Sequence, residues 1–249
     1  MRILASFFSL LTFLTIVSSQ IMIYNCSQLQ SLTVNDTSVS YLLANDIDCS
    51  SVPNFSPVGN CSQNISFQGV LDGQNHVICN IFMNRSENGV GIIGNALNAT
   101  IKNIRIQNAT VYVIGPTSSI LENIGILLGV GVSTVVTNCH LEGNESSVNQ
   151  VKTNGGGAGG LIGTICNMGS LVANCTVTNT LLDGDPVYSN SVGCVVGAVA
   201  FSAVMADCHN FGFIGRPSTI VATGGNAVGG VVGFVDRASL SRSGITQGT

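Results

Sequence analysis

Charged side chains are scarce in this sequence. Lysine and arginine number 8 and aspartate and glutamate 12, so 8% of the 249 residues are charged, against about a quarter in ordinary soluble proteins. The basic residues are scattered singly, which excludes the basic stripe of a nucleic-acid-binding protein and a polybasic lipid-binding patch. Disordered chains are highly charged, so we expect this one to fold. Its solubility then depends on neutral polar residues or glycans.

The sequence has a single long hydrophobic run, which lies within the first 20 residues, and no other follows it. Arg2 is followed by apolar residues from Ile3 to Val17 and by the small residues Ser18 and Ser19. This order of charge, apolar core and small residues is typical of a secretory signal peptide. A membrane anchor is the alternative, but spanning takes about 20 apolar residues. We therefore expect a signal peptide over residues 1–19, and a secreted or cell-surface chain that starts at Gln20 and has no membrane span.

Asn-x-Ser/Thr triplets are frequent, which in a secreted eukaryotic protein indicates N-glycosylation. A bacterial origin would make them mere composition. The triplet at Asn54 is the weakest, because Pro57 follows its Ser56. The glycosylation candidates are Asn25, Asn35, Asn60, Asn64, Asn84, Asn98, Asn108, Asn144 and Asn174.

The sequence lacks the cysteine spacing of a zinc site, so we expect no metal and no cofactor. Its nine cysteines are an odd number, hence at least one is unpaired or pairs between chains. Four lie in the irregular N-terminal third, where loops can bring them together, and their pairing cannot be deduced. These disulfide candidates are Cys26, Cys49, Cys61 and Cys79.

The clearest positive signal is an internal repeat. Two apolar residues followed by glycine recur five times, at spacings of 35, 34, 34 and 36 residues. The last glycines of these cores are Gly94, Gly129, Gly163, Gly197 and Gly233. A second block follows 10 to 12 residues after each of them. Its central position is occupied in turn by Ile104, Cys139, Cys175, Cys208 and Ser243.

The composition of the repeat indicates strands. It is rich in Val, Ile and Thr with frequent Gly and Asn, which excludes helical solenoids. The second block alternates, and we expect Leu171, Ala173, Cys175 and Val177 on one face and Val172, Asn174 and Thr176 on the other. One short strand face cannot be buried alone, but stacked coils bury a continuous interior. The sequence therefore predicts an all-β, right-handed parallel β-helix, or β-solenoid, with repeats of about 34 residues.

Stacking would place the repeat cysteines Cys139, Cys175 and Cys208 in one inward column. Neighbouring parallel strands lie about 4.8 Å apart, whereas the Cβ atoms of a disulfide are about 3.8 Å apart. We therefore expect three reduced thiols that fill the core as small apolar groups.

The repeat cores resemble the GLUG motif of bacterial and protist surface proteins, including adhesin-like chains and extracellular parts of streptococcal immunoglobulin A peptidases. The upstream stretch from Tyr41 to Ile81, with NDID and FQGVLDGQNHVI, resembles the first coils that often precede such repeats. The resemblance implies an N-terminal cap and first coils over residues 20–88, and five repeats over residues 89–249. It implies an adhesive or spacer module and brings no active site, because the peptidase chemistry lies on another domain.

Parallel β-helices also include polysaccharide lyases and hydrolases, which need carboxylates in defined pairs. Asp46, Asp48 and Asp72 are the best candidates. The first two belong to the NDID scaffold, and Asp72 before Gly73 is typical of a turn. We expect no catalytic residue in this chain.

The three histidines and a glycine run have structural interpretations too. His140 and His209 should be solvated on the surface two rungs apart, with Thr176 between them, too far apart for a shared metal. His76 should hydrogen-bond across a turn. The G-x-G-x-x-G at Gly155 belongs to the repeat and not to a dinucleotide site.

The sequence thus predicts a non-enzymatic secreted or cell-surface β-solenoid for adhesion, spacing or glycan contact, whose partners are cell-surface glycans or proteins. The alternative is a polysaccharide-active β-helix enzyme or its inactive descendant. A third possibility is a fragment without its own function, because no distinct capping sequence follows the fifth repeat and an open coil needs a cap. We expect the C-terminal cap to be missing and the natural protein to be longer.

Overall fold

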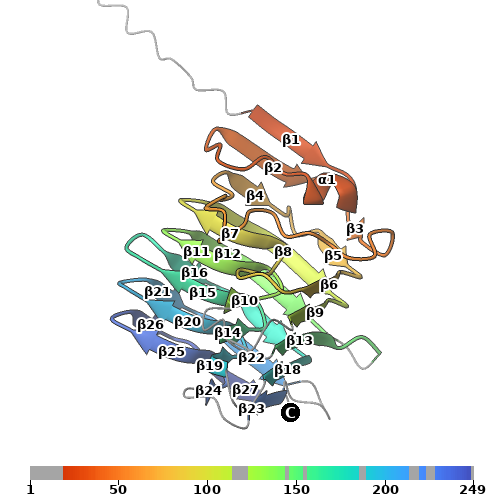
Figure 1. Ribbon diagram of the computed structural model, residues 1–249. Helices are drawn as coiled ribbons and strands as arrows, with labels where there is room; N and C mark the ends of the chain where they lie inside the picture. Colours follow the sequence, from red (N-terminus) through yellow and green to blue (C-terminus); the bar gives the residue numbers. More distant parts are fainter. Residues whose placement is uncertain are drawn as a thin grey trace, which may run out of the picture.

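The computed structural model describes residues 19–113, 123–143, 146–153, 156–184, 189–212, 219–222 and 228–247. Nearly all of them lie in short strands, and the strands stack along one long axis (Figure 1). The expected signal peptide, apart from Ser19, lies outside the described residues. The single helix of the described part is α1 (Cys26–Gln30).

The largest sheet has 13 strands and contains both ends of the stack. All its strand pairs are parallel, with β1 at one end and β26 at the other (Figure 1). We call it the main sheet. Its strands are β1 (Ser19–Ile23), β2 (Val39–Leu43), β3 (Ile47–Asp48), β4 (Val70–Asp72), β5 (Val77–Cys79), β8 (Thr100–Gln107), β12 (Val135–Glu142), β16 (Leu171–Ala173), β17 (Thr176–Thr178), β21 (Val204–Ala206), β22 (His209–Gly212), β26 (Ser239–Ser241) and β27 (Gly244–Gln247).

Three smaller parallel sheets form the other sides of the coils. The first contains β7 (Ile93–Leu97), β11 (Leu128–Val132), β15 (Ile162–Cys166), β20 (Val196–Ala200) and β25 (Val232–Asp236). The second contains β6 (Phe82–Arg85), β9 (Thr110–Val113), β13 (Asn149–Thr153), β18 (Thr180–Gly184) and β23 (Thr219–Ala222). The third contains β10 (Asn123–Ile124), β14 (Gly156–Gly159), β19 (Ser189–Gly193) and β24 (Val228–Gly229).

The register between coils follows the repeat of the sequence. Leu128 pairs with Ile93 on one side and with Ile162 on the other. Ile162 pairs in turn with Val196, and Val196 with Val232. Each of these residues immediately precedes the last glycine of a repeat core, so one repeat forms one coil. The prediction of an all-β parallel solenoid with a repeat of about 34 residues is confirmed.

The repeat glycines mark places where backbones approach closely. A Cβ on Gly163 would overlap the amide nitrogen of Ile124 and would lie 2.6 Å from the carbonyl oxygen of Gly129. Both contacts are to backbone atoms of the preceding coil, which cannot rotate away. Glycine is therefore required here by space.

The expected alternation of the second block is wrong in its first half. Val172 is fully buried, whereas Leu171 and Ala173 are only partly buried. The reason is Asn174, whose φ of 51° places it in the left-handed region. One such residue turns the chain between β16 and β17 and resets the side-chain phase. After it, Cys175 points inward as expected.

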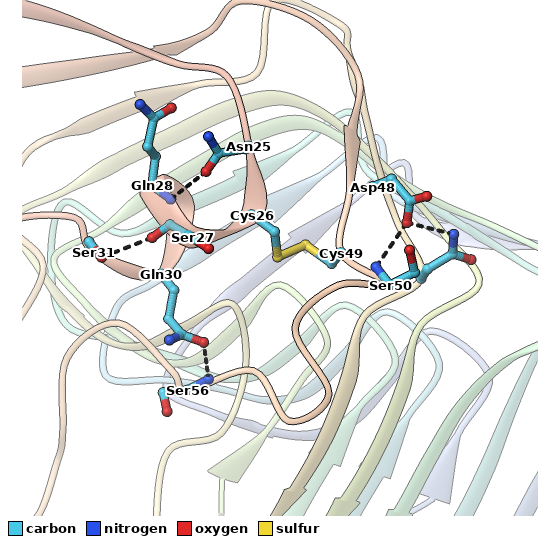
Figure 2. The surroundings of a disulfide bond; sticks show 11 residues. Asn25, Cys26, Ser27, Gln28, Gln30, Ser31, Asp48, Cys49, Ser50 and Ser56 are labelled. Carbon is cyan, nitrogen blue, oxygen red and sulfur yellow. Dashed lines mark hydrogen bonds between the residues drawn. A yellow bond between two sulfur atoms is a disulfide. The ribbon is translucent and has the colours of Figure 1, made fainter.

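The first coil is closed by a helix and a disulfide. The side chain of Asn25 accepts a hydrogen bond from the backbone N–H of Gln28 and so caps α1 (Figure 2). Leu29 of α1 is fully buried in the core. The helix thus contributes an apolar side chain to the interior where the first coil lacks a second long strand.

Candidate functional site

The aspartates that are candidates for lyase chemistry hold neighbouring coils together. Asp46 accepts hydrogen bonds from the backbone N–H of Val77 at 2.9 Å and interacts with His76 Nδ1 at 3.0 Å. His76 therefore bonds between coils and not across its own turn. The hydrogen bond from Val77, followed by that from His76, lowers the pKa of Asp46. Asp48 accepts a hydrogen bond of 2.8 Å from the amide of Asn80, which likewise lowers its pKa.

Asp72 is the most enclosed of the three carboxylates. It accepts hydrogen bonds from the backbone N–H of Gln74 at 2.9 Å and from the amide of Asn103 at 3.0 Å. Lys102 Nζ lies 3.2 Å away. Burial raises the pKa of Asp72, but these hydrogen bonds and the lysine outweigh it, and the pKa is lowered. The Asp72 side chain thus stabilises a turn and a rung, as the Asp-Gly pair indicates.

A ladder of asparagines follows the corner of the main sheet. Asn75, Asn103, Asn138 and Asn174 all have positive φ. The Asn138 amide donates to Oδ1 of Asn103 at 2.9 Å and of Asn75 at 3.2 Å, and Asn174 donates to Asn138 at 3.2 Å. Asparagine tolerates the left-handed conformation and also carries a donor and an acceptor. It therefore both turns each coil and joins it to its neighbour.

Beside this ladder lies an ion pair between β8 and β12. Arg105 donates from Nε and Nη2 to the two carboxylate oxygens of Glu142, at 2.9 and 2.8 Å. Gln107 donates to the same carboxylate at 3.0 Å. Burial raises the pKa of Glu142, but the hydrogen bonds from Arg105 and Gln107 dominate and lower it. The Glu142 carboxylate raises the pKa of Arg105 in return.

The repeat histidines are two rungs apart, since Thr176 pairs with His140 on one side and with His209 on the other. Both are partly buried, so they are less solvated than expected. His140 Nδ1 lies 2.8 Å from Thr176 Oγ1, and its Nε2 lies 3.0 Å from Asn138 Oδ1. Burial lowers the pKa of His140. This imidazole is therefore neutral near pH 7 and joins the ladder.

We call the asparagine ladder, the Arg105–Glu142 pair, His140 and the adjacent Lys102 the polar ladder face. Every carboxyl group of the described residues whose pKa is displaced has it lowered, whereas a general acid at neutral pH needs it raised. No group of three or more His, Cys, Asp or Glu within the described ranges is arranged to hold a metal ion. What this face can do is present amides, the Lys102 ammonium group and the Arg105–Glu142 pair at a fixed spacing.

The structure places the repeat cysteines on neighbouring rungs, with Cys139, Cys175 and Cys208 fully buried and not disulfide-bonded. Burial raises the pKa of Cys175 well above its ordinary value, and the hydrogen bond with Cys175 raises that of Cys208. Burial also raises the pKa of Cys194 to about 12. The thiolate forms of Cys175, Cys194 and Cys208 are therefore suppressed.

Thiol titration should show these states directly. We expect the denatured, unreduced protein to release seven thiols, which is the nine cysteines less the two in the disulfide. In the native protein at pH 8, the three column thiols should not react with an aromatic disulfide reagent, because all three are fully buried and out of its reach. Mass spectrometry of the labelled peptides identifies which cysteines react. A column found oxidised, or labelled at a rate close to that of a free thiol, contradicts the arrangement.

Of the four N-terminal cysteines, two form a bond. Cys26 and Cys49 are joined across the first coils (Figure 2). The expectation of a disulfide for Cys61 and Cys79 is not met, since both are free. Cys61 Sγ packs against Gly89, while Cys79 lies on β5 and pairs with Asp48 of β3. The two therefore lie on different sides of the coil.

The sequons lie on the outside of the coils. Asn60 is partly buried, and Asn144 lies outside the described residues. The other candidate asparagines are exposed, namely Asn25, Asn35, Asn64, Asn84, Asn98, Asn108 and Asn174. Glycosylation stays a prediction.

Sequence reasoning did not foresee the polar ladder face. Its signal was present, because asparagine precedes the central position of the second block in three consecutive coils, at Asn103, Asn138 and Asn174. Such a recurrence at a fixed place is typical of a stacked turn. The Arg105–Glu142 pair had no comparable signal, since each residue occurs in one repeat alone.

The fold and this face define the chain as a parallel β-solenoid. No family model and no curated protein matches it. The crystal structure of a candidate immunoglobulin A1 protease from Bacteroides ovatus is similar, with a TM-score of 0.65 and 20% identity over 93% of this chain and 68% of that chain. This likeness shows the fold. The GLUG resemblance remains a prediction from the sequence.

Among the described residues, no helix has the length and apolar character needed to cross a bilayer. The Cys26–Cys49 disulfide is compatible with an extracellular protein, because such bonds persist in oxidising compartments.

Proposed function

We propose that this chain is a non-enzymatic secreted or cell-surface β-solenoid of the GLUG-repeat type that acts as an adhesive or spacer module. The observation that carries the proposal is the polar ladder face, on which side chains of consecutive coils stand one rung apart, about 4.8 Å. The amides and the Arg105–Glu142 pair are already fixed by hydrogen bonds. An extended partner would therefore meet donors and acceptors that lose little conformational entropy on binding.

The chemistry of this face suits surface glycans. Amide, hydroxyl and guanidinium groups hydrogen-bond to sugar hydroxyls, and the low charge of the chain requires no strongly charged partner. The carboxylates that a polysaccharide lyase or hydrolase would use are engaged as coil-to-coil acceptors with lowered pKa values. This engagement supports binding over catalysis.

A glycan array and a cell-binding assay test the proposal, with two matched variants. Lys102→Gln removes a cation from the polar ladder face, where it pairs with Asp72 at 3.2 Å. Lys152→Gln removes one from β13 in another sheet, where it pairs with Asp183 at 3.0 Å. We expect the first to weaken retention about tenfold, as one lost charged contact of about 1.4 kcal/mol does, and the second to leave it unchanged.

Two results would contradict parts of the proposal. Failure to bind any glycan or cell surface overturns the adhesive function and leaves that of a spacer. Release of reducing sugar from pectin-like polymers, abolished by Asp72→Asn in a folded protein, establishes a polysaccharide-active enzyme instead.

A further inference from the structure

A hollow of about 370 Å³ opens on the side of the solenoid between three consecutive coils. Its walls come from residues 30–34 of the first coil, 56–65 of the second and 87–89 of the third. The backbone N–H of Ser56 donates to Oε1 of Gln30 at 2.8 Å, which joins the first two of these walls. The hollow therefore has a coil on either side of it along the axis. We call it the lateral recess.

The lateral recess exists because the second coil takes a shorter path than the third. At one corner the backbone N–H of Phe55 donates to the carbonyl oxygen of Phe82 at 2.8 Å. At the next corner the N–H of Val58 donates to the carbonyl oxygen of Ile92 at 3.0 Å. The two residues between Phe55 and Val58 thus cross a side that residues 83–91 cross in the third coil. The chain that is missing from this side of the second coil leaves the space.

Arg85 holds the short path in place. Its Nε and Nη2 donate to the carbonyl oxygen of Phe55 at 3.0 and 2.6 Å. Its Nη2 also donates to the carbonyl oxygen of Asn54 at 2.9 Å and to Oγ of Ser56 at 2.8 Å. The wall of the recess is therefore fixed before any ligand arrives, which reduces the entropy lost on binding.

Two polar side chains of the third coil keep capacity for a ligand. Glu87 Oε1 lies 3.9 Å from Arg85 Nε, and Glu87 Oε2 accepts a hydrogen bond of 3.4 Å from the backbone N–H of Ser86. Both contacts are long, so the carboxylate retains most of its acceptor capacity. Asn88 Oδ1 accepts from the backbone N–H and Nδ2 of Asn123, each at 3.2 Å. Asn88 therefore offers its Nδ2 group as a donor, next in sequence to the acceptor Glu87.

The remaining properties of the recess suit a sugar ring. Arg85 partly offsets the charge of the Glu87 carboxylate, so the recess does not favour a cation. The volume is at the small end of the range of about 300 to 1,000 Å³ for ligand sites. A pyranose ring carries hydroxyl groups on its edge and apolar C–H groups on its faces. The apolar residues that line the recess and can pack against such a face are Leu32, Val34, Pro57, Val58 and Ile65.

We propose that the lateral recess binds a single neutral hexose ring, with Glu87 accepting hydrogen bonds from its hydroxyl groups and Asn88 donating one from Nδ2. This goes beyond the proposed function, because the recess shares no residue with the polar ladder face and holds one sugar unit instead of an extended partner. Binding in the recess does not depend on whether the polar ladder face retains glycans or cells.

NMR titration of the isotope-labelled protein with D-glucose, D-galactose and D-mannose, each added alone, tests the proposal. We expect at least one of them to shift the amide signals of Gly59 and Gly89, which line the recess. The signal of Gly131 on β11, in a later coil, should stay unchanged. A ligand of this size should bind with a dissociation constant of about 1 mM.

Three variants identify the groups that bind. Glu87→Gln keeps the shape of the side chain and removes its charge, and it should weaken hexose binding about tenfold. Asn88→Asp keeps the acceptor for Asn123 and removes the donor, so it should weaken binding by a similar factor. Asp183→Asn is the matched control, because it removes a carboxylate that is 34% exposed, against 35% for Glu87, from a strand outside the recess. It should leave binding unchanged. Circular dichroism verifies that each variant is folded.

The proposal is overturned if none of the three hexoses shifts the signals of Gly59 and Gly89, whatever a glycan array shows. It is also overturned if Glu87→Gln binds the hexose as tightly as the wild-type protein. A third contrary result is that methylammonium shifts these signals more strongly than the hexoses and binds more tightly to Asn88→Asp, since this identifies a cation site. Hexose binding in the recess without retention of glycans or cells supports this proposal and contradicts the adhesive function.

Discussion

Replacing Gly159 by alanine should destabilise the solenoid by about 3 kcal/mol or more. Gly159 ends β14, and a Cβ there would overlap the carbonyl oxygen of Ile162 and lie 2.8 Å from the amide nitrogen of Gly197. Both neighbours are backbone, one in the same coil and one in the next. Relief therefore requires moving two coils apart, which breaks the parallel pairing between them. Denaturant unfolding followed by circular dichroism measures the loss.

Gly244→Ala is the matched control. Gly244 also lies in a strand, β27, but no atom of the described residues lies within 4 Å of the position that its Cβ would take. We expect this substitution to change the free energy of unfolding by no more than about 0.5 kcal/mol. Equal unfolding midpoints for the two variants would show that the close approach at Gly159 is absent.

Removing the Cys26–Cys49 disulfide by the double substitution Cys26→Ala and Cys49→Ala should cost about 3 kcal/mol. The bond closes a loop with a sequence separation of 23, and constraining such a loop in the unfolded chain contributes a free energy of this size. Both cysteines are buried, at 1% and 0% exposure, so their loss also removes packing in the first coils. Thermal unfolding with and without a reducing agent measures the effect.

The loss should be local, because each coil of a solenoid contacts only its neighbours. Hydrogen exchange should therefore accelerate in β1, α1 and β2 and stay slow in β12 and β15. Cys79→Ala removes a free cysteine from β5 of the same region and should cost less than about 1 kcal/mol. If reduction leaves exchange in the first coils unchanged, the disulfide does not stabilise them.

The register of the coils follows from the spacing of the repeats alone. Residues such as Leu128 and Ile162 pair because they occupy the same place in successive repeats. Parallel stacking puts like on like, so sequence spacing translates directly into strand pairing. The burial of Cys139 and Cys175 follows from the same rule.

The face of the strand on which each side chain lies was harder to predict from the sequence. Strand alternation assigns Leu171 and Ala173 to the interior, yet the left-handed Asn174 reverses their phase and sends Val172 inward. A prediction from periodicity assumes an unbroken strand. A single residue with positive φ interrupts the strand, so the prediction fails although the spacing of the repeats is unchanged.

The amino-acid sequence by itself determined that this chain folds as stacked coils of about 34 residues, because the repeated apolar cores can be buried only on one another. Only the tertiary structure decided which side chains bond to one another across the coils, namely the disulfide partner of Cys26, the Arg105–Glu142 ion pair and the hydrogen bonds through Asn138. These contacts depend on the angle at each corner, which is not contained in the spacing of residues along the chain.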